Sequence, residues 1–109
     1  MVPSGPVSVL VCRVSGTWPY RSWAVSQGFE DLVAGLNRLP TVTSSWTCLY
    51  PTSTSDDLTY ELKFHYSVGP DTFIRVTSRC RPGVDNYVIA ANDSSSIIPL
   101  VQQLIARQP

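Results

Sequence analysis

The sequence has little charge and few of the side chains that build catalytic or metal centres. Only 15% of its 109 residues are charged, whereas an average domain has about 25%. Eight basic residues balance eight acidic ones, and there is one histidine. This balance gives no bulk attraction to nucleic acid, and we expect no nucleic-acid partner. No cluster of metal-ligating residues is visible, so we also expect no metal and no cofactor.

Long hydrophobic runs are absent as well. The longest apolar run, residues 9–12, is far shorter than the roughly 20 residues that cross a bilayer. A chain of this length has room for one hydrophobic core. Because residues 1–6 contain two prolines and a glycine, we expect a flexible lead-in there and a single domain over residues 7–109.

The cysteines lack the paired short spacings of zinc sites and of CxxC redox motifs. Three are present, Cys12, Cys48 and Cys80, so one disulfide and one leftover thiol is the simplest arrangement. Nine prolines and many Ser and Thr residues are typical of exported domains. We therefore expect an extracellular or cell-surface protein whose leader, with or without a lipid anchor, has been removed. Three reduced cysteines in a cytosolic core are the alternative.

Two helices are predicted by apolar residues at intervals of three and four. The first covers residues 29–39, has acidic residues in its first turn and ends at Pro40. The second follows the capping residues at 93–96 and has its apolar stripe at Ile97, Val101, Leu104 and Ile105.

Strands are predicted on both sides of the first helix. Residues 7–14 are almost wholly apolar, as in a central strand, and pair with residues 20–26 in a hairpin. Strict alternation over residues 58–68 predicts a strand with one buried face, which turns at 69–71 into a strand over 72–80; a short last strand covers 87–91. The order β-β-α-β-β-β-α predicts an α+β two-layer sandwich, with about five mostly antiparallel strands and both helices on one face.

A register for this central hairpin suggests a disulfide. If Tyr66 pairs with Ile74, Tyr60 lies opposite Cys80 and both side chains point to the core. Cys48, in the loop that enters the hairpin, can then cross the strand end and reach Cys80. A Cys12–Cys48 bridge is the competing arrangement.

These features resemble those of a group of exported and lipoprotein domains of actinobacteria. The resemblance includes Val11-Cys12-Arg13 on the first strand, the helix at 29–39, a cysteine after a Ser/Thr-rich loop, and Phe64-His65-Tyr66 before the hairpin that ends at Cys80. It covers nearly the whole chain and implies an exported domain.

The element order also resembles the subtilisin-inhibitor-like family. In that family a cysteine just before the protease-binding bond is bridged to a cysteine after the following hairpin, which Cys48 and Cys80 would match. The resemblance places Leu49, Tyr50 and Pro51 on the binding loop. Proline after the specificity position is a poor match, and the family's second disulfide has no counterpart here.

A catalytic role would have to start from His65, which alternation places on the solvent face of the central hairpin. No nucleophile elbow and no acidic partner at a useful spacing accompany it, so we do not expect an enzyme. Lys63, His65, Arg75 and Arg79 share this face, with Glu61 opposite Arg79. They form either a small basic patch for an acidic partner or, as we prefer, a solvated face with cross-strand ion pairs.

Aromatic side chains are unusually frequent in the loops. Trp46 and Tyr50 lie within the long loop 41–57, next to the proposed disulfide. Aromatic residues in loops are common at recognition surfaces, although Trp46 and Trp23 could instead close the edge of the core. We therefore expect a non-catalytic interaction domain that binds another protein through Trp46, Leu49 and Tyr50, and protease inhibition is the alternative.

Overall fold

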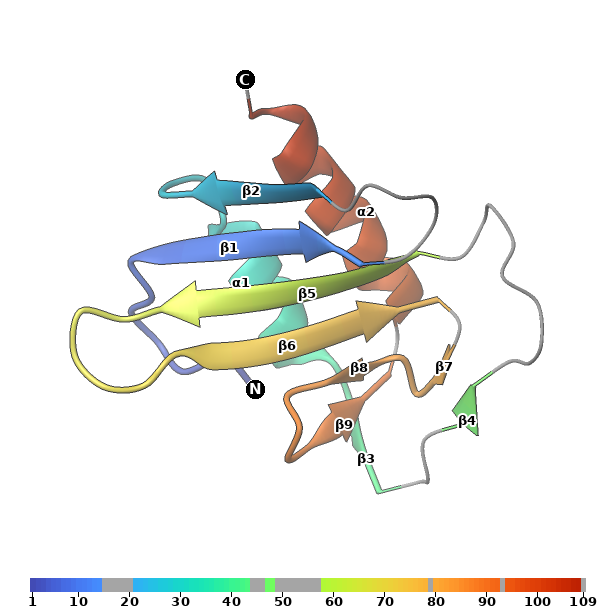
Figure 1. Ribbon diagram of the computed structural model, residues 1–109. Coiled ribbons are helices and arrows are strands. Elements are labelled where there is room, and N and C mark those ends of the chain that lie inside the picture. The colour runs from blue at the N-terminus through green and yellow to red at the C-terminus, as the bar shows by residue number, and fades with distance from the viewer. Residues whose placement is uncertain (15–20, 44–46, 49–57, 79, 93, 109) are drawn as a thin grey trace.

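The computed structural model describes residues 1–14, 21–43, 47–48, 58–78, 80–92 and 94–108. Within these described residues, two helices, α1 (Glu30–Arg38) and α2 (Ser94–Ala106), accompany nine strands, and Figure 1 shows their arrangement. The strands are β1 (Ser8–Arg13), β2 (Arg21–Val25), β3 (Thr41–Val42), β4 (Thr47–Cys48), β5 (Thr59–His65), β6 (Thr72–Thr77), β7 (Cys80–Arg81), β8 (Val84–Asp85) and β9 (Ala90–Ala91).

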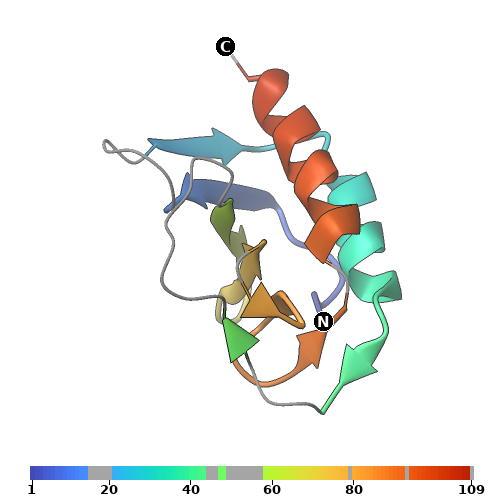
Figure 2. The ribbon, with the colours of Figure 1, turned by 90° about the vertical axis from the view of Figure 1, so that its right-hand side faces the viewer.

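Seven strands form one antiparallel sheet in the order β2-β1-β5-β6-β8-β9-β3, and β4 pairs with β7 in a separate two-stranded ladder. Both helices lie on the same side of the large sheet (Figure 2). The predicted α+β class is confirmed, whereas the layers differ in detail from the expected two-layer sandwich because the β4–β7 ladder is separate from the large sheet. The sheet has more strands than the five expected, because β3, β8 and β9 are two-residue strands without an alternation pattern.

The core lies between the sheet and the helices. Tyr60, Leu62 and Phe64 on β5 are buried, whereas the residues between them are exposed. Leu32 and Leu36 form the buried stripe of α1, and the ring of Phe29 meets that of Phe64 edge-on at 6.5 Å. The core is therefore filled by side chains that the strand alternation and the helical stripe predicted to be buried.

The two helices approach each other closely at Gly35. A Cβ atom on this residue would lie 2.9 Å from Leu100 Cδ1 and 3.3 Å from Ile97 Cδ1 on α2. Because glycine has no side chain, α1 and α2 can pack side by side over the sheet.

The expected register of the central hairpin is wrong. Leu62 lies opposite Ile74 and Tyr60 opposite Val76, so β6 is shifted by four residues relative to the Tyr66–Ile74 pairing. The shift has a simple cause: β5 ends at His65 and β6 begins at Thr72, so the connection is longer than the turn at 69–71. An even shift keeps every side chain on its predicted face.

The segment after β6 also differs from prediction. β6 ends at Thr77 instead of continuing to Cys80, so Cys80 does not lie opposite Tyr60 but belongs to β7, which pairs with β4. The last strand expected at 87–91 is instead the tight hairpin β8–β9, with its turn at Tyr87 and Val88.

Residues 1–6 do more than lead into β1. The side chain of Val2 is only 3% exposed and belongs to the core cluster. Polar side chains from α1 and from the loop after β5 hold the backbone of Val2 and Pro3. Residues 1–3 of the expected flexible lead-in are thus held against the fold, whereas Ser4 and Gly5 are exposed. Glycine and proline content reveals nothing of such long-range contacts.

Candidate interaction surface

The face of the sheet opposite the helices carries a mixture of apolar and charged side chains. One row across neighbouring strands consists of Leu10, Lys63 and Phe73. Leu10 is 36% exposed and Phe73 is 50% exposed, and the Lys63 ammonium lies 5.9 Å from the centre of the Phe73 ring. The apolar run of the first strand therefore does not mean burial on both faces. Val9 and Val11 face the core, whereas Leu10 between them lies on the open face.

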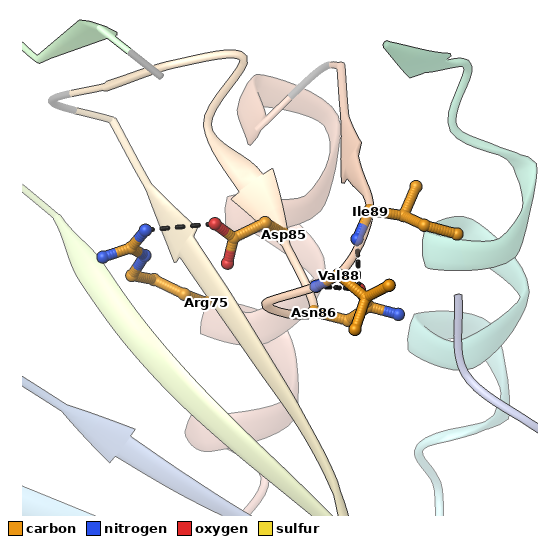
Figure 3. A network of polar contacts seen from close by, with 5 residues as sticks. All are labelled: Arg75, Asp85, Asn86, Val88 and Ile89. Carbon is orange, nitrogen blue, oxygen red and sulfur yellow. Dashed lines mark hydrogen bonds and ion pairs between the residues drawn. The ribbon is translucent and has the colours of Figure 1, made fainter. Parts of the chain in front are cut away.

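The next row is charged and contains Glu61, Arg75 and Asp85. The Arg75 Nη2 atom donates a hydrogen bond of 3.0 Å to Asp85 Oδ2, as Figure 3 shows. The sequence-based pairing of Glu61 with Arg79 is wrong, because Glu61 lies opposite Arg75. The four-residue shift in the pairing of β5 with β6 is the cause.

A second polar cluster forms where β5 and β6 are joined. His65 Nδ1 and Asp71 Oδ1 are 2.8 Å apart, and Lys63 Nζ lies 3.5 Å from Asp71 Oδ2. The hydrogen bond with His65 lowers the pKa of Asp71, and the charges of His65 and Lys63 act in the same direction. Lys63 is thus paired with Asp71, and Arg75 with Asp85. These ion pairs agree with the solvated, ion-paired face that we preferred to a basic patch.

Asp71 is an acidic partner for His65 that the sequence analysis missed. The two residues are six apart, and only the return of the loop between β5 and β6 brings them together. An imidazole oriented by a carboxylate can act as a general base where a nucleophile or substrate lies within reach of its other nitrogen. His65 lies on an exposed strand end, at the last residue of β5.

Large exposed hydrophobic side chains gather at one end of the sheet, which we call the apolar end. It comprises the start of β1 and the loop between β5 and β6, both on the left in Figure 1, and the turn between β8 and β9, which lies below them and nearer the middle. The backbone hydrogen bond from Val7 N–H to His65 O ties the first two together. Its exposed members are Val7, Val68, Phe73, Tyr87, Val88 and Ile89.

The β8–β9 turn presents three of these side chains in sequence. Asn86 Oδ1 accepts hydrogen bonds from the backbone N–H groups of Val88 and Ile89, at 3.0 and 2.7 Å (Figure 3). Tyr87 has a φ of 70°, a left-handed conformation that is rare for an aromatic residue. Asn86 therefore fixes a strained turn whose apolar side chains point into solvent; Val88 is 87% exposed.

Tyr87 connects this turn to the charged row. The Arg75 guanidinium lies 5.5 Å from the centre of the Tyr87 ring. Partial burial raises the pKa of the Tyr87 hydroxyl, the charges of Glu61 and Asp85 act in the same direction, and Arg75 opposes them. The phenol thus stays neutral and can donate or accept a hydrogen bond from a partner.

A cavity of about 570 Å³ opens beside the turn. Phe73 and Tyr87 supply its aromatic wall, and Met1 and Pro3 border it on the side of the N-terminal segment. Its remaining lining residues are Asp71, Thr72 and Asn86.

One cysteine lies in the large sheet, and the other two lie in the β4–β7 ladder. Cys12 is a free cysteine on β1, and burial followed by the charge of Glu61 raises its thiol pKa, although Lys63 opposes this. Cys48 lies directly opposite Cys80 in the β4–β7 ladder. Opposed residues of antiparallel strands have Cα atoms about 4.5–5.5 Å apart, within the range that a disulfide spans.

The predicted binding residues fall into two groups. Lys63, His65 and Arg75 share the open sheet face, as expected from alternation. Trp46, Leu49, Tyr50 and Arg79 lie outside the described residues. The apolar end was missed, because its members come from three separate turns and strand ends; the run Tyr87-Val88-Ile89 was the one signal available.

The described residues contain no group of three His, Cys, Asp or Glu side chains placed to hold an ion. Neither α1 nor α2, the helices of the described chain, is long and apolar enough to cross a membrane. Comparison with known proteins returned no matching family model, no matching curated protein and no matching solved structure.

Proposed function

We propose that the chain is a non-catalytic interaction domain that binds a protein partner at the apolar end. The single observation that carries this proposal is that Phe73 and Tyr87 line one cavity beside the turn that exposes Val88 and Ile89. Contiguous exposed apolar patches are uncommon on monomeric proteins and mark interaction sites. Aromatic residues are favoured at such sites because they bury much area at a small cost in side-chain entropy.

The electrostatics favour an uncharged contact. Arg75 is paired with Asp85, and Lys63 is 3.5 Å from the carboxylate of Asp71, so the two cations beside the apolar end are already partnered. A partner with an apolar, weakly charged surface would fit here better than a polyanion. This agrees with the composition, which offers no bulk attraction to nucleic acid.

The test is partner capture from a cell-envelope extract with the immobilised full-length protein. The double substitution Tyr87→Ser and Val88→Ser removes two exposed apolar groups and should abolish capture. The matched control is Gln102→Ser with Gln103→Ser on the exposed side of α2. Equal capture by the wild-type protein and the Tyr87/Val88 variant would refute the proposal.

A second pair of variants separates loss of binding from loss of fold. Phe73→Ser alters a half-exposed side chain on the open face and should change the free energy of unfolding by about 0.5 kcal/mol or less. Phe64→Ala, on the adjacent strand but fully buried, should cost about 3–5 kcal/mol. Reduced capture by Phe73→Ser with an unchanged unfolding curve would assign the loss to the surface.

Export remains part of this proposal, and the opposed positions of Cys48 and Cys80 support it. The loop with Trp46 and Tyr50 remains a second predicted contact. Their replacement by alanine should weaken capture while the fold stays intact; collapse of the fold would show that they belong to the core.

The subtilisin-inhibitor-like alternative has one structural observation in its favour. Cys48, which directly precedes the presumed binding loop, lies in a ladder with Cys80, as the resemblance requires. Titration of subtilisin with the protein tests this alternative. Rapid cleavage at Tyr50 without inhibition would eliminate it.

A further inference from the structure

We infer that the groove occupied by residues 1–3 is a binding site for an extended peptide in which a small branched apolar residue precedes proline. The chain's own N-terminal segment fills this groove and competes with the peptide. This inference deepens the proposed function, on which it rests, by naming the chemistry of the partner segment.

Three side chains from separate elements hold the backbone of residues 1–3. On α1, Asn37 accepts a hydrogen bond of 2.7 Å from Val2 N–H and donates one of 2.9 Å to Val2 O. After β5, the Tyr66 hydroxyl donates to Pro3 O at 2.7 Å. After β8, Asn86 Nδ2 lies 3.4 Å from Met1 O.

These contacts are independent of the peptide's own side chains. A carboxamide that pairs with both polar groups of one residue recognises any extended backbone, much as a neighbouring β-strand does. Selectivity then comes from the two positions that the groove distinguishes. The side chain of Val2 is 3% exposed within the core cluster, so its site fits a small branched apolar group. Proline has no N–H to satisfy and keeps the chain extended.

The segment is joined to the sheet by a connection that can open. Ser4 and Gly5 are exposed, and Gly5 has a φ of 88° with open space around its Cα atom. The strand β1 begins at Ser8, so its pairing with β2 and β5 does not involve residues 1–3. The segment can therefore leave the groove without breaking the sheet.

The cavity of about 570 Å³ adjoins the segment at Met1 and Pro3. No part of residues 1–3 fills this space, and Phe73 and Tyr87 line it. A longer peptide would continue into it, which links the groove to the apolar end.

The experiment uses the full chain with Val2→Ser, which weakens the segment's hold on the groove. The probe is the acetylated and amidated peptide Met-Val-Pro-Ser, titrated while ¹⁵N–¹H spectra report the side-chain amides of Asn37 and Asn86, both of which contact residues 1–3. We expect saturable shifts with this variant. Binding to the wild-type chain should be at least tenfold weaker, because a tethered segment competes at an effective concentration in the millimolar range. Val2→Ala serves the same purpose if Val2→Ser does not fold.

Two controls define the site. Asn37→Ala, added to the Val2→Ser chain, should abolish the shifts of the Asn86 side-chain amide, and the peptide Met-Pro-Val-Ser should produce none. Absence of saturable shifts with both Val2 variants, or unchanged affinity after Asn37→Ala, overturns the inference. Partner capture that depends on Tyr87 and Val88 would persist in that case, so failure of the groove is distinguishable from failure of the proposed function.

Discussion

The carboxamide of Asn37 pairs with both backbone polar groups of Val2, although 35 residues separate them in the chain. This contact fastens the first residues to α1 and helps bury the Val2 side chain in the core. Asn37→Ala should lower the free energy of unfolding by about 1–2 kcal/mol, since two hydrogen bonds of ordinary strength are lost. Urea denaturation measures this change. Hydrogen exchange at the Val2 amide should accelerate at the same time, and unaltered exchange would contradict the assignment.

Gly83 should tolerate no side chain. Its φ is 99°, and an added Cβ atom would lie 2.8 Å from Ser94 Oγ and 3.0 Å from the Cys80 carbonyl oxygen. Gly83→Ala therefore combines backbone strain with a steric clash and should destabilise the fold by about 2 kcal/mol or more. Thermal denaturation provides the measurement.

Gly28→Ala is the matched control for this substitution. Gly28 has a φ of 82° but nothing within 4 Å of the added atom, so the alanine incurs backbone strain alone. The Gly28 variant should melt at a higher temperature than the Gly83 variant. Equal melting temperatures would show that the close approach to Ser94 is unimportant.

The β4–β7 ladder predicts a disulfide between Cys48 and Cys80. Intact mass without reductant should be two hydrogens below the reduced mass, and peptide mapping should join the peptides that contain these two residues. The bridge would close a loop of a little over 30 residues, so Cys48→Ser should cost about 3–4 kcal/mol on the chain-entropy model. Cys12→Ser, which alters a free thiol, is the control and should leave the bridge in place. Three alkylatable thiols in protein from its native compartment would overturn both the bridge and the exported reading.

The hydrogen bond between His65 and Asp71 should make the free energy of unfolding depend on pH in the acidic range. The pKa of Asp71 is lowered in the folded state, so this carboxylate stabilises the fold above its unfolded pKa of about 3.9. The contribution is lost as the pH falls through the lowered folded-state value. Asp71→Asn should therefore flatten the decline in unfolding free energy at acidic pH, as measured by urea denaturation at a series of pH values.

A carboxyl NMR titration of Asp71 tests the cause directly. His65→Asn should shift the pKa of Asp71 upward, because the bond with His65 is the largest influence on it. An unshifted titration curve would assign the effect to Lys63 instead.

Local patterns in the sequence determined the elements and their faces. The alternation at Tyr60, Leu62 and Phe64 and the stripe with Leu32 and Leu36 predicted a strand and a helix that the structure contains. These predictions succeed because side-chain direction repeats every two residues in a strand and every 3.6 in a helix, independently of distant parts of the chain.

Only the tertiary structure decided which distant residues meet. The length of the loop after β5 fixed the register and brought Asp71 to His65, and the pairing of β6 with β8 placed Asp85 beside Arg75. The docking of Val2 on Asn37 leaves no periodic trace in the sequence either. Such contacts depend on how loops close and strands align over long separations, and a short window of sequence carries no record of that geometry.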